Sequence, residues 1–327
     1  MTFDHLWQEI TTDSMAAGSI MRRVHPELSH DVFLGESRPG GQRFLALALH
    51  GPVGEVPQLK RLSRGVDVKV ILETATRAAV QLTETTQSHS SLFQELVDDV
   101  VALLVAEPGD GAAARIVERV MAWQSFFATS RAGLSAEQEA GLFAELYILR
   151  RTLIPDMGAP AAIRAWAGPH GAHQDFHTAS GALEVKSFRG IGPGHMRITS
   201  ERQLEEIGAG ALFLAYVELD ERTDGTGESI SQAVGATRQD VSGSVAASID
   251  LQDKLLQVGY HESQADRYTD KFSVRGMTYY RVEGAFPRLT SAHLPTGIGK
   301  VSYQLDQAAI LDWETTSDAV FKVIEGE

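Results

Sequence analysis

The first third of the chain alternates between apolar and polar positions at the period of β-strands. Such runs, separated by glycine- or proline-containing turns, predict strands over residues 31–34, 42–49, 66–73 and 78–83. Apolar residues then recur at helical spacing from 91 to 107 and from 112 to 128, and residues 1–30 contain a further predicted helix. We therefore expect an N-terminal β-rich and helical domain over residues 1–130, with a structural, specificity or docking role.

A helix predicted from residue 135 to about 153 carries an acidic side chain close to its buried stripe. Ser135 and Gln138 form a capping-box pattern at its start. Glu145 lies at the edge of the leucine stripe and not on the solvated face, so its carboxylate needs a partner. In a functional interpretation Glu145 holds a metal ion or a metal-bound water. In a structural one it pairs with the arginines at 150 and 151, or stays exposed.

The segment from Gln174 to Ser187 brings acidic and basic side chains together. A turn sequence, residues 178–181, separates two runs rich in strand formers and predicts a β-hairpin. Glu184 and Lys186 are expected to share one face because side chains alternate along a strand, and a hairpin could bring Asp175 on the partner strand beside Glu184. Two carboxylates next to a lysine can bind a hard divalent cation and steady the anion that the cation activates. The structural alternative is an ordinary ion pair, although lysine is rare in this chain relative to arginine.

The residues around the hairpin add polar groups. A glycine-containing segment, 188–199, carries Arg189 and Arg197 and is predicted to be a substrate-facing loop. Ser200 and Gln203 form a second capping-box pattern, which predicts a helix to about residue 207 whose free N-terminal amides could bind a phosphate. Gln203 could be a polar site residue or only a cap.

Two histidines, His173 and His177, flank Asp175 and alternate onto the same strand face as it. Imidazole suits transition metals, so both could be ligands. We favour the alternative that they are hydrogen-bonding neighbours of the site or lie at a sheet edge.

The C-terminal part continues an α/β pattern. A continuous apolar run, 211–217, is typical of a strand that is covered on both faces. A Gly- and acid-rich loop is predicted at 218–227 and an interrupted helical region at 229–259. Further strands at 272–274, 278–282 and 300–305 precede a closing helix around 318–324. Residues 261–327 could extend the sheet or form an oligomer interface.

Composition narrows the classes of function. The chain has no cysteine, which excludes disulfides, thiolate metal sites and cysteine nucleophiles. We find neither a secretory signal nor an apolar run of membrane-spanning length, and expect a soluble cytoplasmic protein with no membrane partner. The net charge of −14 is unfavourable for binding nucleic acid. Basic groups nevertheless outnumber acidic ones in residues 145–202, although a solvated loop with ordinary arginines would look the same.

The order Glu145, Asp175, then Glu184-Val185-Lys186 resembles the PD-(D/E)xK phosphodiesterase superfamily, the fold of many restriction endonucleases. The phrases Ala165-Trp-Ala-Gly-Pro169, Gln174-Asp-Phe176, Leu183-Glu-Val-Lys-Ser187 and 197–204 are similar to a narrower bacterial group within it, whose genes often lie among restriction and phage-defence genes. One departure is Gln174, which stands where the superfamily motif has proline.

This resemblance implies an α/β fold: a restriction-endonuclease-like core, a mixed sheet flanked by helices, over residues 131–260, between the N-terminal β-rich domain and a C-terminal strand-rich extension. It implies Mg²⁺, with Mn²⁺ as a substitute, held by Asp175, Glu184, the Val185 carbonyl and Glu145. Lys186 would complete the catalytic set. The residues expected to contact substrate are Arg189, Arg197, Ser200 and Gln203.

The function implied is a Mg²⁺-dependent endonuclease that hydrolyses phosphodiester bonds of DNA, or of RNA, in a restriction or phage-defence system. Implied partners are further copies of the chain or defence subunits such as an ATPase or a methyltransferase. The alternative, which the overall acidity supports, is a catalytically silent nucleic-acid-binding or scaffold subunit of a defence complex.

Overall fold

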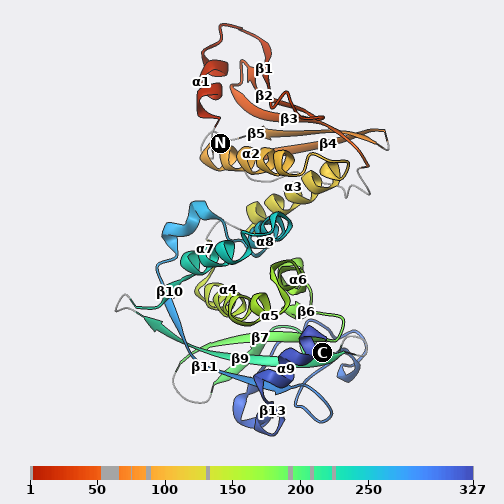
Figure 1. Cartoon of the computed structure of the whole chain (residues 1–327), viewed down its shortest axis with the longest axis vertical. Helices are drawn as coiled ribbons and strands as arrows, with labels where there is room; N and C mark the ends of the chain where they lie inside the picture. The colour runs from red at the N-terminus through yellow and green to blue at the C-terminus, as the bar shows by residue number, and fades with distance from the viewer. Residues whose placement is uncertain are drawn as a thin grey trace. The chain divides into compact units, whose positions relative to one another are not determined.

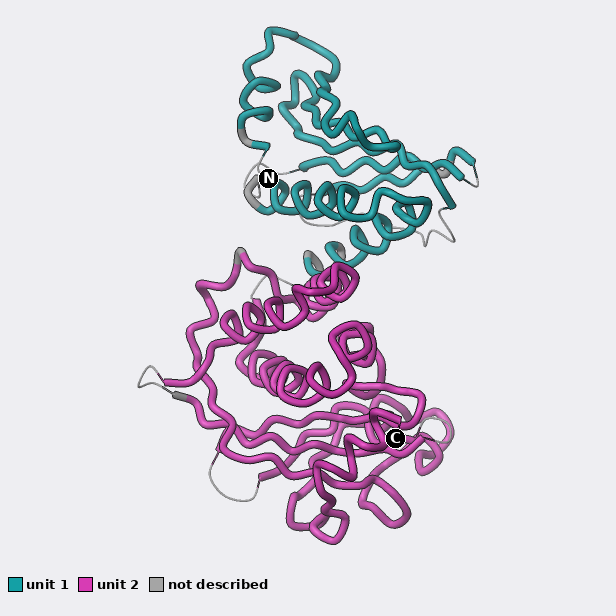
Figure 2. The backbone as a smooth tube through the Cα atoms, in the orientation of Figure 1, with its two compact units in different colours: residues 1–131 teal, residues 132–327 magenta. Residues whose placement is uncertain are grey.

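A computed structural model describes residues 3–52, 66–74, 76–85, 90–129, 133–190, 194–206, 210–222 and 226–326. Contacts within the chain divide it into two compact units, Met1–Arg131 and Ala132–Glu327 (Figure 2). Among the described residues, no helix is both long enough and apolar enough to cross a membrane.

Unit 1 is built on an antiparallel sheet in the order β1-β2-β3-β5-β4 (Figure 1). Every second side chain of β5 is buried, as the alternating pattern predicts: Ala78, Val80 and Leu82 are all at most 1% exposed. The four predicted strands are confirmed, as are the three predicted helices. The elements of unit 1 are α1 (Asp4–Thr12), β1 (Gly18–Val24), β2 (Asp31–Arg38), β3 (Gln42–His50), β4 (Val66–Thr74), β5 (Arg77–Glu84), α2 (Ser90–Ala106) and α3 (Ala112–Thr129).

Strand β1 was not predicted from the sequence. It is an edge strand, and in it only Ile20 is fully buried while its neighbours are exposed or half-buried. A strand with a single buried position has no alternation of apolar and polar residues, so its sequence does not indicate a strand.

Unit 2 contains a mixed sheet in the order β10-β11-β9-β7-β6, with β13 paired to β11. Strands β7 and β9 run parallel, and the other pairs are antiparallel. The strands of this unit are β6 (Phe176–His177), β7 (Gly181–Arg189), β8 (His195–Ile198), β9 (Ala211–Arg222), β10 (Glu228–Ser229), β11 (Lys271–Arg281), β12 (Tyr303–Asp306) and β13 (Glu314–Thr315).

Two apolar layers sandwich this sheet. On one face Leu183 of β7 and Phe213 of β9 pack in a core with the helices. On the other face Leu214 and Tyr216 of β9 pack with Met196 of β8, where β8 and β12 form a separate antiparallel pair. The helices of the unit are α4 (Ala136–Ile148), α5 (Ile154–Met157), α6 (Ala159–Ala165), α7 (Ile230–Val241), α8 (Val245–Val258) and α9 (Ser317–Glu325). Strand β9, covered on both faces, confirms the expectation from its continuous apolar run.

Three boundaries differ from those predicted. The helix that starts with the Ser135 capping box is α-helical only to Ile148 and continues as a π-helical turn over Leu149–Leu153. The predicted strands at 272–274 and 278–282 are a single strand, β11, with an irregularity between Val274 and Gly276. Strand β9 runs to Arg222, so the loop predicted at 218–227 begins later, and its residues 223–225 lie outside the described part.

Candidate functional site

The predicted hairpin is confirmed, and it places Asp175 opposite Glu184. Strands β6 and β7 pair antiparallel with Phe176 facing Leu183, and the turn is closed by the Thr178 amide, which donates to the Gly181 carbonyl at 2.9 Å. Asp175 directly precedes β6, so the register sets it against Glu184. Strand β6 has only two residues and pairs with β7 only at Ala182 and Leu183. From Glu184 onward, this edge of β7 has no neighbouring strand among the described residues.

Asp175 caps this open edge. Its Oδ2 accepts a hydrogen bond of 2.7 Å from the Val185 amide, a group that has no strand partner there. The amides of Ala167 and Gly168 donate to the Asp175 carbonyl at 2.8 and 3.0 Å. The backbone and the side chain of Asp175 are therefore both fixed beside the second acid.

Glu184 is 1% exposed and forms an ion pair with Lys186, whose Nζ lies 2.6 Å from Glu184 Oε1. Glu184 Oε2 is buried and has no hydrogen-bond partner in the described part of the chain. Burying a carboxylate oxygen without a donor costs free energy. A cation bound to this oxygen would offset that cost.

Glu145 reaches the same site from α4. Its Oε2 accepts a hydrogen bond of 2.7 Å from the indole N–H of Trp166. The structural alternative for Glu145 does not hold, because Arg150 pairs with Glu228 at 2.9 Å and Asp240 at 3.3 Å, and the guanidinium of Arg151 lies over the ring of Tyr147.

Burial and mutual repulsion disturb the acids of this cluster. Burial raises the pKa of Glu145 well above its ordinary value, with the charge of Asp175 as the next contribution. Burial also raises the pKa of Asp175. The pKa of Glu184 is raised to about 8, first by burial and then by the charge of Asp175. Burial lowers the pKa of Lys186, but the charges of Glu184 and Asp175 outweigh it and raise that pKa overall. Ionising all three acids beside a single lysine is therefore unfavourable unless a cation is bound.

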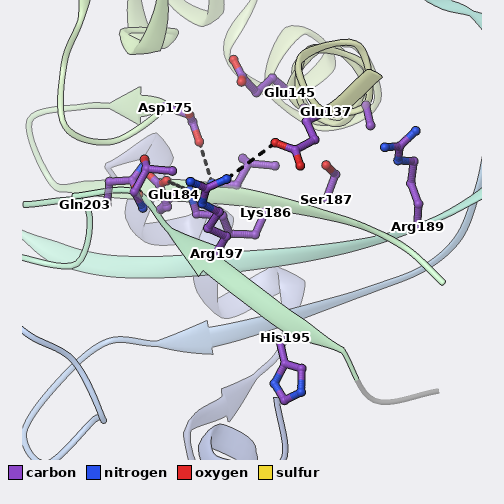
Figure 3. A pocket seen from close by; sticks show the side chains of 14 residues that line it. Glu137, Glu145, Asp175, Glu184, Lys186, Ser187, Arg189, His195, Arg197 and Gln203 are labelled. Atoms are coloured by element: carbon purple, nitrogen blue, oxygen red, sulfur yellow. Dashed lines mark hydrogen bonds and ion pairs between the residues drawn. The ribbon is translucent and has the colours of Figure 1, made fainter. Parts of the chain in front are cut away.

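These groups line a cavity of about 380 Å³ in which most of the expected site residues meet (Figure 3). The structure brings together Glu145, Asp175, Glu184, Val185, Lys186, Arg189, Arg197 and Gln203. Six lining residues were not proposed for the site from the sequence: Glu137, Ala140, Gly141, Ser187, His195 and Thr199.

Each arginine of the cavity faces an acid. Arg189 Nη1 lies 3.5 Å from Glu221, and Arg197 Nη1 lies 3.9 Å from Glu137, the latter pair being largely exposed. The segment expected to be a loop is mostly strand: β7 includes Arg189 and β8 includes Arg197, while residues 191–193 lie outside the described part.

The prediction of a helix starting at Ser200 is wrong. Residues 201–204 form a turn, and Ser200 does not line the cavity. In a helix, the backbone carbonyls of this segment would accept hydrogen bonds from amides further along the chain. Here the side chain of the buried Gln174 donates instead, from Nε2 to the carbonyls of Arg202, Gln203 and Glu205 at 2.9–3.1 Å.

Gln203 lies at the cavity, and it caps no helix because none begins at Ser200. Its Oε1 accepts from the Thr199 amide at 2.8 Å and hydroxyl at 3.1 Å. The histidines behave as hydrogen-bonding neighbours: His177 Nε2 lies 2.8 Å from Gln174 Oε1, and His173 Nε2 lies 3.4 Å from Arg202 Nη1. Neither lines the cavity.

The donor set suits a hard divalent cation. Within the described part, no three His, Asp or Glu side chains are close enough to hold a metal by themselves. Mg²⁺ does not require such a cage, since it keeps several waters and binds through one or two carboxylates. Asp175, the free oxygen of Glu184 and the carbonyl of Val185 would supply protein oxygens, with Glu145 across the cavity.

A family model described as "Putative PD-(D/E)XK family member, (DUF4420)" matches residues 3–308. No match was found among curated proteins or among solved structures. The mixed sheet flanked by helices is consistent with a restriction-endonuclease-like core, as the resemblance implied. The match covers most of the chain, and the chain therefore belongs to this PD-(D/E)XK family.

Proposed function

We propose that the protein is a Mg²⁺-dependent endonuclease that hydrolyses phosphodiester bonds of nucleic acid, with DNA as the favoured substrate. The observation that carries the proposal is the meeting of Asp175, Glu184 and Lys186 at one open strand edge, with a buried carboxylate oxygen that lacks a donor. Membership of the family supports a nuclease-like fold. Mn²⁺ should substitute for Mg²⁺, because both take oxygen ligands.

The cation would be held by Asp175, Glu184 and the Val185 carbonyl, and Glu145 would hold a second ion or an ion-bound water. When bound, the ion lowers the pKa of a water and offsets charge on the phosphate. The side chains beside it would do the positioning. Lys186 carries donors only, so it can orient the attacking water and stabilise the negative charge that develops on the phosphate.

Arg189 and Arg197 line the same cavity and would bind the phosphate oxygens, since a guanidinium presents parallel donors. Each must first give up its present partner, Glu221 or Glu137. Both pairs are long and partly exposed, so their separation costs little.

The test is cleavage of DNA and RNA by purified protein with Mg²⁺ or Mn²⁺. We expect Asp175→Ala and Lys186→Ala each to lower the cleavage rate at least about a hundredfold. Arg77→Ala is a matched control, because Arg77 pairs with Glu73 on β4 and takes no part in the cavity. Cleavage that survives both site substitutions would contradict the assignment.

The setting of the activity is also a proposal. We infer a role in restriction or phage defence, with further copies of the chain or subunits such as an ATPase or methyltransferase as partners. One such site cuts one strand, so a double-strand cut requires two engaged copies. Cleavage assays with and without co-purifying subunits test this inference.

A catalytically silent nucleic-acid-binding or scaffold subunit is the second candidate. The net charge of −14 and the pairing of both cavity arginines with acids favour it, because these features weaken the attraction for a polyanion. Calorimetric titration with Mn²⁺ distinguishes the candidates. Binding that Asp175→Ala abolishes favours the enzyme, whereas absence of binding by the wild-type protein favours the scaffold.

A further inference from the structure

Trp166, which directly follows α6, contacts the acidic cluster through its side chain. It is 0% exposed, and its indole N–H donates to Glu145 Oε2 at 2.7 Å. An indole has one donor and no acceptor. The bond therefore fixes one oxygen of Glu145 and leaves the second oxygen for a cation or a water.

The backbone around Trp166 is held firmly. Trp166 forms a β-bridge with Phe176, next to Asp175. Lys254 of α8, which is 4% exposed, donates from Nζ to the carbonyls of Ile163 and Trp166. The indole is thus attached to a part of the fold that has little freedom to move.

The same short segment also holds the second acid. The amides of Ala167 and Gly168 donate to the Asp175 carbonyl. Residues 166–168 therefore contact both Glu145 on α4 and Asp175 beside β6. In this way they set the distance between two acids that come from different elements.

Glu145 needs such a constraint because its neighbours repel it. In the ionised state that a metal ligand requires, Glu145 is repelled by the charges of Asp175 and Glu184. An unrestrained glutamate side chain would turn away from them, because rotation about its side-chain bonds costs little compared with the repulsion between buried like charges.

We propose that Trp166 is a positioning residue, which holds the Glu145 carboxylate toward Asp175 and Glu184 so that all three can act on one cation site. This inference rests on the proposed function. Partners that orient metal ligands in this way typically change metal affinity or activity 10- to 100-fold when they are removed. Nothing in the tryptophan's position suggests contact with the substrate, since its side chain is fully buried.

The test measures Mn²⁺ binding to the full-length protein by titration calorimetry. Trp166→Phe keeps an aromatic ring and removes the N–H donor, and we expect it to weaken Mn²⁺ binding about 10- to 100-fold. Trp7→Phe is the matched control: Trp7 is 2% exposed, and its indole nitrogen has no hydrogen-bond partner in the described part of the chain. The control should bind Mn²⁺ as the wild-type protein does.

A double-mutant cycle separates positioning from a general loss of packing. If Trp166 acts through Glu145, Trp166→Phe should have no further effect on Mn²⁺ affinity in a Glu145→Ala background. Equal losses in both backgrounds would overturn the inference. If Trp166→Phe does not fold, Glu145→Asp tests the same bond, because it keeps the charge and shortens the reach to the indole. We expect Glu145→Asp to bind as weakly as Glu145→Ala, and wild-type binding by it would contradict the inference.

The two proposals fail in different ways. Absence of Mn²⁺ binding by the wild-type protein overturns the proposed function and the inference together. Wild-type binding that Trp166→Phe leaves unchanged overturns the inference alone.

Discussion

At the scale of single residues, the site depends on the small size of Gly168. A Cβ at that position would lie 2.9 Å from Asp175 Oδ1 and 3.3 Å from Asp175 Cα. The second contact is with the backbone, which cannot rotate out of the way. A side chain at residue 168 would therefore press on Asp175, whose carboxylate accepts from the Val185 amide.

We expect Gly168→Ala to displace Asp175 and to weaken Mn²⁺ binding at least about tenfold, as for other losses of ligand orientation. Titration calorimetry measures the effect. Gly235→Ala in α7 is the control, since a Cβ there meets nothing within 4 Å and alanine favours a helix. Unchanged binding by Gly168→Ala would mean that Asp175 is not a ligand or that the site accommodates the methyl group.

The raised pKa of Glu184, about 8, predicts how metal binding depends on pH. Below pH 8 this carboxyl holds a proton in the metal-free protein, and a cation must displace the proton to bind. Mn²⁺ affinity should therefore increase with pH, by about tenfold per unit for each proton displaced, and level off above about pH 8. Calorimetry in buffers of different ionisation enthalpy counts the released protons. Affinity that is constant from pH 6 to pH 8 would contradict the prediction.

At the scale of elements, two capping-box patterns had different outcomes. The pattern at Ser135 starts α4 because a long amphipathic stripe follows it, and both bonds of the box are present. The same pattern at Ser200 forms only a turn. There, Gln174 takes three carbonyls of the turn, and the buried Glu201 accepts the Val301 amide at 2.9 Å. These partners are 28 to 100 residues away in sequence, beyond the reach of any local pattern.

The hairpin could be predicted because its turn and its alternation are both local. The face shared by Glu184 and Lys186 follows from the same alternation. The role of Trp166 could not be predicted, since its bond joins residues 21 apart in sequence whose elements meet only in the folded chain. The sequence around Trp166 contributes to the family resemblance, but it indicates no role for the indole.

Gln174 stands where the superfamily motif has proline. Its side chain connects the hairpin to the turn after β8 through hydrogen bonds to three backbone carbonyls. Gln174→Leu should lower the free energy of unfolding by about 1–3 kcal/mol, because three partly buried carbonyls lose their donor. Chemical denaturation measures this change. Gln81→Leu in β5 is the comparison, since that amide donates to a single hydroxyl, of Thr83, at 3.2 Å. Equal effects of the two substitutions would argue against an anchoring role for Gln174.

At the scale of the whole molecule, the net charge of −14 limits how nucleic acid can bind. If the cavity binds the substrate, attraction comes chiefly from its basic groups, Lys186, Arg189 and Arg197. A protein that contacts few phosphates has a shallow dependence of affinity on salt concentration. Weak binding by the isolated chain would be the physical reason for a partner that delivers the substrate.

Arg189→Ala and Arg197→Ala should each lower duplex affinity and reduce the slope of log affinity against log salt by about 0.9, the value for one phosphate contact. Catalytically inactive Lys186→Ala protein can be used, so that binding is measured without cleavage. Fluorescence anisotropy over a salt series gives the slopes, with Arg77→Ala as the control. Slopes that neither cavity arginine changes would place the nucleic-acid surface elsewhere.

The most direct test of the nuclease assignment is a crystal structure with Mn²⁺, in which anomalous diffraction locates the ion. We predict a peak in coordination contact with the carboxylates of Asp175 and Glu184 and the carbonyl of Val185, which disappears in Asp175→Ala crystals. A peak at some other place, or none at these three groups in protein that binds Mn²⁺ in solution, would contradict the account.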